Sequence, residues 1–150
     1  MKITCIMVLT IVLILSRTTH CTAASEFIGI VKTVSQDAFL IRKGETIAAS
    51  VNMKMMVGDV VRTGPNGAIG FILKDDTIIS MGSGSEVVID DFLFDPVEKK
   101  LSLIARMFHG TAAYLSGQIV KLSPESVRFE TPAATIGMRG THFLVKTGEE

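Results

Sequence analysis

Apolar residues along the chain come in short runs, separated by turn-forming residues at intervals of about 8–12 positions. Within Ala68–Leu73 the side chains alternate, so that Ile69, Phe71 and Leu73 face one side of the expected strand. This spacing predicts an all-β fold. The expected strands cover residues 27–34, 38–42, 60–63, 68–73, 77–81, 86–94, 127–130 and 141–146.

Turn residues separate these runs. The strongest signal is Gly64-Pro65-Asn66-Gly67, because proline fixes φ and Asn-Gly tolerates positive φ. Strands this short and frequent leave no room for helical crossovers, so a sandwich, a barrel or a solenoid-like winding remains open. Other turns are expected at 43–45, 57–59, 74–76, 82–85 and 95–96.

The run 101–108 fits two periodicities. Leu101, Ile104, Ala105 and Phe108 have helical spacing, whereas every second residue from Leu101 onward fits a strand equally well. The neighbouring runs are strands, so a strand is favoured here too. We expect His109-Gly110 to end it.

The first 24 residues are typical of a signal peptide. Lys2 supplies a positive end, an apolar stretch runs over residues 3–15, and small residues follow up to Ala24. A membrane-spanning helix needs about 20 apolar residues, so this stretch is short for an anchor. We expect cleavage after Ala23 or Ala24, a periplasmic or secreted location, and one β domain over 25–150. Membrane contact is expected only through an uncleaved leader.

Removing this leader changes the composition. The whole chain has 15 basic and 15 acidic residues, and the loss of Lys2 and Arg17 leaves 13 basic residues against 15 acidic ones. Neither balance favours nucleic acid. Both cysteines lie in the leader; Cys21 follows His20, which fits a lipidation signal poorly, so lipidation is disfavoured and stays open. There is no tryptophan and one tyrosine, which weighs against stacking of sugars or bases.

Metal and cofactor sites are not indicated. Met53, Met55 and Met56 form a cluster that suits Cu(I), but such methionines more often fill a core. His109 and His142 lack the spacing of a zinc motif. We therefore expect no metal and no cofactor.

Catalytic residues are not indicated either. The pairs Asp75-Asp76 and Asp90-Asp91 lack calcium-loop spacing and are interpreted as solvated turn residues. The Gly-Ser repeat at 82–85 lacks the ending of a phosphate loop and the pattern of a nucleophile elbow. The protein is not expected to be an enzyme.

The stretch 131–145 is the most unusual, because two glycines and several small residues surround a single cation, Arg139. Small residues let backbones approach closely. Arg139 is then either a structural group that fixes a strand crossing, which is the favoured interpretation, or a contact for a ligand or partner.

Several motifs together resemble the FecR-like periplasmic domain family. The segment Val57-Gly58-Asp59 followed by Val60–Thr63 is similar to its Gly-Asp signature, and residues 131–141 resemble its Thr-Pro … Thr-Ile-Gly-x-Arg-Gly-Thr ending. The resemblance covers nearly all of 27–146. It marks Gly58, Asp59, Arg139, Gly140 and Thr141 as candidate partner contacts or structural motifs.

The resemblance implies an all-β, solenoid-like winding of short strands and no catalytic residues. Family members that regulate sigma factors carry this domain in the periplasm, with further segments on both sides. We expect a stand-alone exported domain that acts as a protein-interaction module in envelope signalling or assembly, with unidentified envelope proteins as partners. The alternative is a periplasmic domain that binds a glycan or small molecule.

Overall fold

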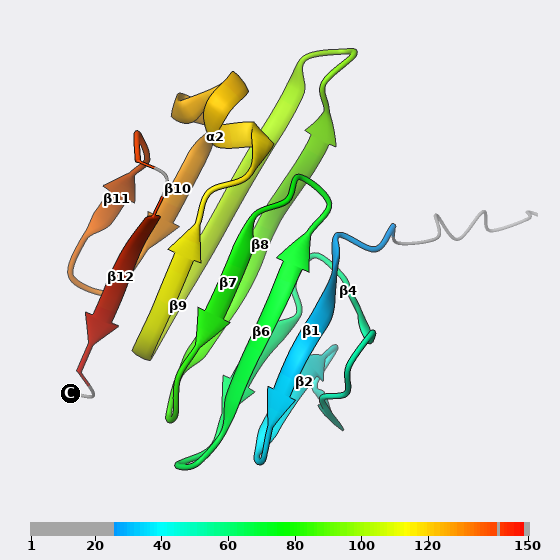
Figure 1. The fold of residues 1–150 in the computed structure, drawn as a ribbon, viewed down its shortest axis with the longest axis vertical. Helices are drawn as coiled ribbons and strands as arrows, with labels where there is room; N and C mark the ends of the chain where they lie inside the picture. Colours follow the sequence, from blue (N-terminus) through cyan, green and yellow to red (C-terminus); the bar gives the residue numbers. More distant parts are fainter. Residues whose placement is uncertain (1–25, 141, 149–150) are drawn as a thin grey trace, which may run out of the picture.

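The computed structural model describes residues 26–140 and 142–148, and these form one curled β-sheet with a short helix (Figure 1). The expected signal peptide, with Cys21, lies outside the described residues. The elements are β1 (Gly29–Ser35), β2 (Ala38–Arg42), β3 (Glu45–Ala48), β4 (Lys54–Met55), β5 (Val60–Thr63), β6 (Ala68–Leu73), β7 (Ile78–Met81), β8 (Glu86–Asp95), β9 (Lys100–Leu115), α2 (Gln118–Leu122), the 3₁₀ turn η1 (Pro124–Ser126), β10 (Val127–Glu130), β11 (Thr135–Gly137) and β12 (His142–Thr147).

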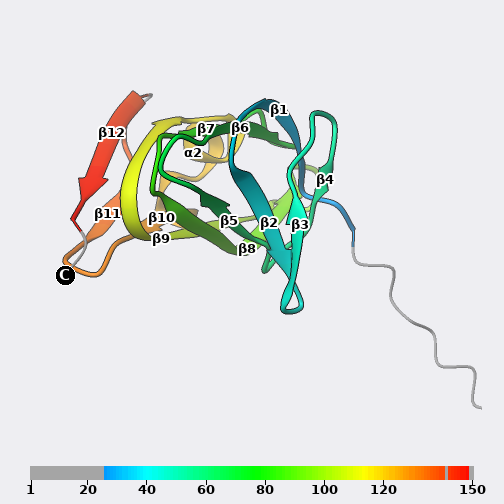
Figure 2. The same ribbon diagram turned by 90° about the horizontal axis from the view of Figure 1, so that it is seen from below.

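The all-β prediction is confirmed. Neighbouring strands follow the order β3-β2-β5-β8-β9-β7-β6-β1-β4, and every pair along this path is antiparallel. The sequence left a sandwich, a barrel and a solenoid-like winding open. The structure is a sheet curled into a half-barrel, which Figure 2 shows end-on. Within the described ranges, no helix has the length and apolar character needed to cross a membrane.

The curl comes from four long strands that bend in the middle. β1 runs on into β2, β5 into β6 and β7 into β8, while β9 makes the bend within one element. One half-sheet therefore has the order β2-β5-β8-β9 and the other has β1-β6-β7-β9. We call the bend line, made of residues 36–37, 64–67, 82–85 and 109–110, the crease, and the opposite end of the folded sheet the open end.

Backbone hydrogen bonds continue across the crease. The Gly64 N–H donates to the Asp37 carbonyl at 2.7 Å, and the Gly84 N–H donates to the Gly64 carbonyl at 3.0 Å. His109 Nδ1 then donates to the Gly84 carbonyl at 2.9 Å. The four bent strands are thus held together at the place where regular pairing is interrupted.

Glycines at the crease are required by close approach. A Cβ on Gly67 would lie 1.9 Å from the Asp37 carbonyl oxygen, and one on Gly110 would lie 2.2 Å from Ser85 Oγ. The turn predicted at Gly64–Gly67 is confirmed, but neither Asn66 nor Gly67 adopts the positive φ that these residues tolerate. Gly110 does, with φ of 98°, and it bends β9.

The preference for a strand over 101–108 is confirmed, but its expected end is wrong. β9 continues through His109 and Gly110 to Leu115. Its first part pairs with β8 and its last part, from Ala112, pairs with β7. The glycine that was expected to stop the strand instead lets it pass from one half-sheet to the other.

The core lies between the two half-sheets. Ile69, Phe71 and Leu73 of β6 are buried, as their alternation predicted. At the β12 side, the Tyr114 ring stacks on Phe143 with centroids 4.9 Å apart, and Phe129 meets both rings edge-on. Short elements absent from the predicted set, namely β3, β4, β11 and α2, extend the sheet edges or cover the core.

Helix α2 covers one half of the open end (Figure 1). It buries Ile119 and Val120, and the Asp75 carboxylate binds its first turn, with the Ile119 N–H 3.4 Å from Asp75 Oδ2. The Thr77 hydroxyl donates to the same oxygen at 2.7 Å. Asp75 is fully buried, so its interpretation as a solvated turn residue is wrong, whereas Asp76 is exposed.

The Tyr114 hydroxyl is buried and has no hydrogen-bond partner among the described residues. Burial, opposed in part by the neighbouring Thr77 hydroxyl and reinforced by the Asp75 carboxylate, raises the pKa of Tyr114 from 10.0 to about 12. The unfolded chain ionises first, so the free energy of unfolding should fall as the pH rises from 10 towards 12, by about 3 kcal/mol in total from this group.

Ultraviolet absorbance checks this directly, because Tyr114 is the only tyrosine in the chain. The expected titration midpoint in the folded protein lies near pH 12. Tyr114→Phe removes an unsatisfied hydroxyl and should leave the stability at pH 7 unchanged or raise it by up to about 1 kcal/mol. A midpoint near 10, or a clear loss of stability in the variant, would contradict this.

Candidate functional site

A β-bulge in β8 turns two phenylalanines toward the interior. Ile89 pairs with Ala105 and Asp91 pairs with Ile104, so Asp90 is an extra residue in the strand. Beyond this extra residue, the side chains of β8 that would have pointed outward point inward, and the reverse. Phe92 and Phe94 therefore face inward, where Asp91 and Asp95 would otherwise point.

The bulge also changes the interpretation of the second acidic pair. Asp90 and Asp91 lie within β8 and are half-buried, so describing them as solvated turn residues is wrong. Asp90 Oδ2 lies 3.1 Å from the Arg106 guanidinium, and Asp91 Oδ2 accepts the Ser102 hydroxyl at 2.5 Å. Each carboxylate has its own neighbour, and they do not form a joint acid–base pair.

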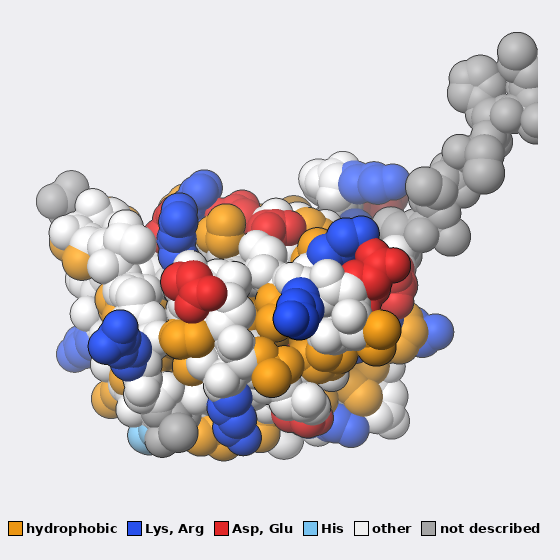
Figure 3. All heavy atoms as spheres, turned by 90° about the horizontal axis from the view of Figure 1, so that it is seen from above, with side chains coloured by type: hydrophobic (Ala, Val, Ile, Leu, Met, Phe, Trp, Pro, Cys, Tyr) orange, Lys and Arg blue, Asp and Glu red, His pale blue; other side chains and the backbone are white. Residues whose placement is uncertain are grey.

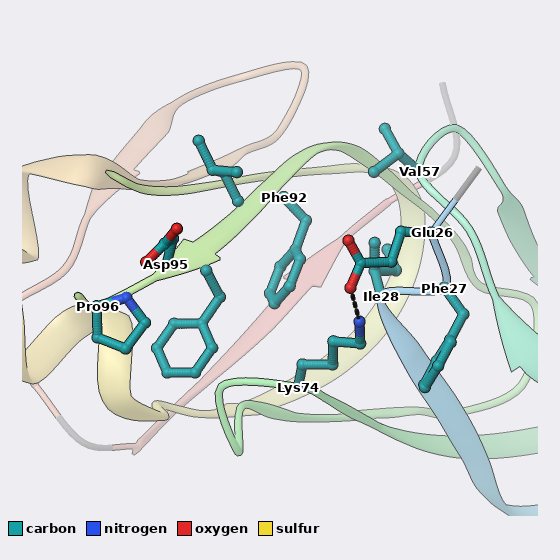
Figure 4. Close-up of a pocket in the computed structure, with 10 residues that line it drawn as sticks. Glu26, Phe27, Ile28, Val57, Lys74, Phe92, Asp95 and Pro96 are labelled. Carbon is teal, nitrogen blue, oxygen red and sulfur yellow. Dashed lines mark hydrogen bonds and ion pairs between the residues drawn. The ribbon is translucent and has the colours of Figure 1, made fainter. Parts of the chain in front are cut away.

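The part of the open end that α2 leaves uncovered is a cleft of about 560 Å³. We call it the open-end cleft. Figure 4 shows the Phe92 ring directed into it from β8, facing Glu26 and Lys74 on the other side, with Asp95 and Pro96 at the end away from Phe27. Its lining is Glu26, Phe27, Ile28, Val57, Lys74, Phe92, Leu93, Phe94, Asp95 and Pro96.

The charged groups of the open-end cleft are already engaged. Glu26 forms an ion pair with Lys74, whose ammonium lies 4.3 Å from the centre of the Phe27 ring. Asp95 Oδ1 accepts the Glu98 backbone N–H at 3.0 Å. The cleft thus offers mainly apolar and aromatic surface, which is typical of a binding site.

A free strand edge lies beside the cleft. β5 ends its pairing with β8 at Val88, so the part of β8 from Asp91 to Asp95 pairs only with β9 among the described residues. Leu93 and Val57 at this edge are 45% and 46% exposed. Figure 3 shows this end of the molecule, where hydrophobic side chains lie exposed between charged ones. Unpaired N–H and C=O groups next to apolar pockets are what an added strand requires.

Gly58 and Asp59 belong to a structural cluster in which Asp59 is buried and Gly58 is exposed. Gly58 has φ of 83°, and its N–H donates to the Ile89 carbonyl at 2.8 Å. Asp59 is 1% exposed; it accepts Arg42 Nε at 2.8 Å, a second Arg42 nitrogen at 2.6 Å and the Met56 N–H at 2.8 Å. The hydrogen bond to Asp59 raises the pKa of Arg42.

Arg139 and Gly140 lie elsewhere, on the surface beyond β11. Both are exposed, and the Gly140 carbonyl accepts the Ser116 hydroxyl at 3.0 Å. Arg139 has no ion pair or hydrogen bond with the described residues, so nothing in that part of the chain supports its favoured role of fixing a strand crossing. Thr141 lies outside the described residues. The structure therefore does not bring Arg139 and Asp59 into one site.

The remaining candidates have structural surroundings. Met55 is fully buried and Met53 packs against the core. His109 is at the crease, while His142 is exposed at the start of β12. Over 26–140 and 142–148, no group of three or more His, Cys, Asp or Glu side chains is placed to hold a metal ion. Ser85 is buried at the crease and accepts the Thr111 N–H.

The sequence analysis missed the open-end cleft. Its residues come from the N-terminal segment, the turn before β5, the β6–β7 turn, β8 and the turn after β8, and no local motif joins them. One feature of the sequence could have indicated the cleft. Phe92, Leu93 and Phe94 follow two aspartates directly and place apolar side chains on both faces of a strand that ends in a turn. Such a strand has an exposed apolar face in addition to the face that packs in the core.

Comparison with protein-family models matches residues 59–150 to the family described as FecR protein. The match begins at the buried Asp59 and includes β5 to β12. Neither the comparison with curated proteins nor the comparison with solved structures gave a match.

Proposed function

Because the chain belongs to the FecR family, we propose that it is an exported, non-enzymatic module that binds a partner protein in cell-envelope signalling or assembly. The family is a regulatory one. The proposed contact surface is the open-end cleft together with the free edge of β8. An extended segment of the partner pairs with this edge and places an apolar side chain between Phe92 and Phe27.

The observation that carries the proposal is the free edge of β8 next to an aromatic cleft. If the core continued to this end of the sheet, it would bury Phe92 and Phe94 completely. Helix α2 does not extend over them, and both rings remain half-buried. Backbone pairing supplies affinity in strand addition, and the pocket beside the edge supplies specificity.

Leu93→Arg tests the surface without touching the core, because Leu93 is 45% exposed. Capture of the partner from envelope extract by the purified domain should fall at least tenfold, since a charge would have to be buried at the contact. The matched control is Leu144→Arg, because Leu144 is 66% exposed on β12 and no residue of β12 lines the cleft. Melting temperatures of both variants should stay close to that of the parent.

Equal capture by the two variants would contradict the proposal. The volume of the cleft also lies within the range of small-molecule sites, about 300–1,000 Å³. A glycan or small molecule would then raise the melting temperature of the domain in a ligand screen, and Leu93→Arg would reduce that shift. Such a shift, without partner capture, would favour the ligand-binding alternative.

A further inference from the structure

The hairpin formed by β10 and β11 carries a second groove, of about 420 Å³. Arg128 lies directly opposite Gly137 in the register of the two strands, so both belong to the outer face of the hairpin. Arg139 follows two residues after Gly137. The groove is lined by Pro124, Glu125, Val127, Arg128, Thr135, Gly137, Met138 and Arg139.

Two arginines in this groove differ from the others in the described ranges. Arg42, Arg62 and Arg106 each form an ion pair with an aspartate or glutamate. Arg128 and Arg139 are exposed and form none with the described residues. The two guanidinium groups share one groove and have no carboxylate partner among the described residues. Their N–H donors are therefore available for bidentate hydrogen bonds to an anion.

The nearby carboxylates are engaged elsewhere. The Ser123 hydroxyl donates to Glu125 Oε1 at 2.5 Å, and this hydrogen bond lowers the pKa of Glu125. Glu130 faces Arg106, with 3.3 Å between Glu130 Oε2 and Arg106 Nε. The groove therefore carries one negative and two positive side chains, and its end at Arg128 and Arg139 is positive.

The edge of β11 is open as well. Thr135–Gly137 pairs with β10 on one side and with no other strand of the described residues. A Cβ on Gly137 would meet nothing within 4 Å, so no side chain separates Arg128 from this edge. An added strand would thus place alternate side chains within reach of Arg128 and Arg139.

We propose that this edge binds an acidic segment of a polypeptide, which adds to β11 as a strand and pairs its carboxylates with Arg128 and Arg139. The site is independent of the open-end cleft, since the residues that line the two have no member in common. The partner expected at the region around Arg139 is thus an extended segment with Asp or Glu at alternate positions.

Synthetic peptides test this at low ionic strength with the whole exported chain. A Glu-Thr repeat should bind, a Lys-Thr repeat should not, and a Glu-Thr repeat interrupted by prolines should bind much more weakly because proline removes ladder donors. The variant Arg128→Gln/Arg139→Gln should weaken binding of the Glu-Thr peptide roughly tenfold. The control Arg62→Gln alters another exposed arginine, one that is already paired with Glu86.

Three results would overturn the proposal. One is no binding of the Glu-Thr peptide; another is an equal loss with Arg62→Gln, which would mean general attraction of charge. The third is binding of vesicles with anionic lipid through Arg128 and Arg139 in place of the peptide. Leu93→Arg should leave peptide binding unchanged, so failure here is distinguishable from failure of the proposed function.

Discussion

Replacing Gly110 with alanine is expected to lower the free energy of unfolding by about 4 kcal/mol, the sum of backbone strain and overpacking. Gly110 has φ of 98°, a conformation that alanine adopts only with strain. The new methyl group would also lie 2.2 Å from Ser85 Oγ and 2.4 Å from Ser85 Cα. Because β9 joins both half-sheets at this point, a shift of its backbone disturbs the crease as a whole. Urea unfolding of the purified protein measures the loss.

Gly44→Ala is the matched control for this change. Gly44 has a similar φ of 84°, but a Cβ there would meet nothing within 4 Å. It should therefore show the strain alone, about 1 kcal/mol. Similar losses in the two variants would mean that the contact with Ser85 is unimportant and that the crease tolerates rearrangement.

Arg42→Met is expected to destabilise the domain by about 3–5 kcal/mol, because it leaves the Asp59 carboxylate buried without its cation. Urea unfolding curves of the variant and of the parent protein at pH 7 measure the loss.

Two companion variants make this result specific. Adding Asp59→Asn to Arg42→Met should recover more than about 1 kcal/mol, since the amide oxygen still accepts the Met56 N–H without a buried charge. Lys100→Met removes a fully surface ion pair with Glu98 and should cost less than about 0.5 kcal/mol. If Arg42→Met behaves like Lys100→Met, the Gly-Asp motif has no structural role of this kind.

Local alternation predicted much of the sheet, because strands with one buried face carry that face in their own sequence. Ala68–Leu73 has the bounds expected from its pattern. The same reasoning stopped β9 at His109-Gly110, since a glycine in a strand ordinarily signals a turn. The bend instead depends on Gly84 and Ser85, in the turn between β7 and β8. Helix α2 is five residues long and has no side-chain cap, and part of its first turn is held by Asp75 from a distant turn.

The site was harder to predict than the fold. The motif at Gly58 and Asp59 stood out in the sequence, but only the contact with Arg42 shows that its carboxylate is buried. Arg139 stood out for its small neighbours, yet its companion Arg128 sits in an ordinary strand pattern and becomes notable only through its register with Gly137. The open-end cleft depends on the bulge at Asp90, and no residue type at this point of the sequence predicts a bulge.

Photo-crosslinking inside cells tests whether the open-end cleft is a contact surface for a protein. A photoreactive phenylalanine analogue at position 93 would face a bound partner, whereas the same analogue at position 144 lies on β12. We expect discrete crosslinked products at position 93, identifiable by mass spectrometry, and few at position 144. The products should be lost when Phe94→Asp is added to a chain that still folds. The same products from both positions, or none from position 93, would contradict this role of the cleft.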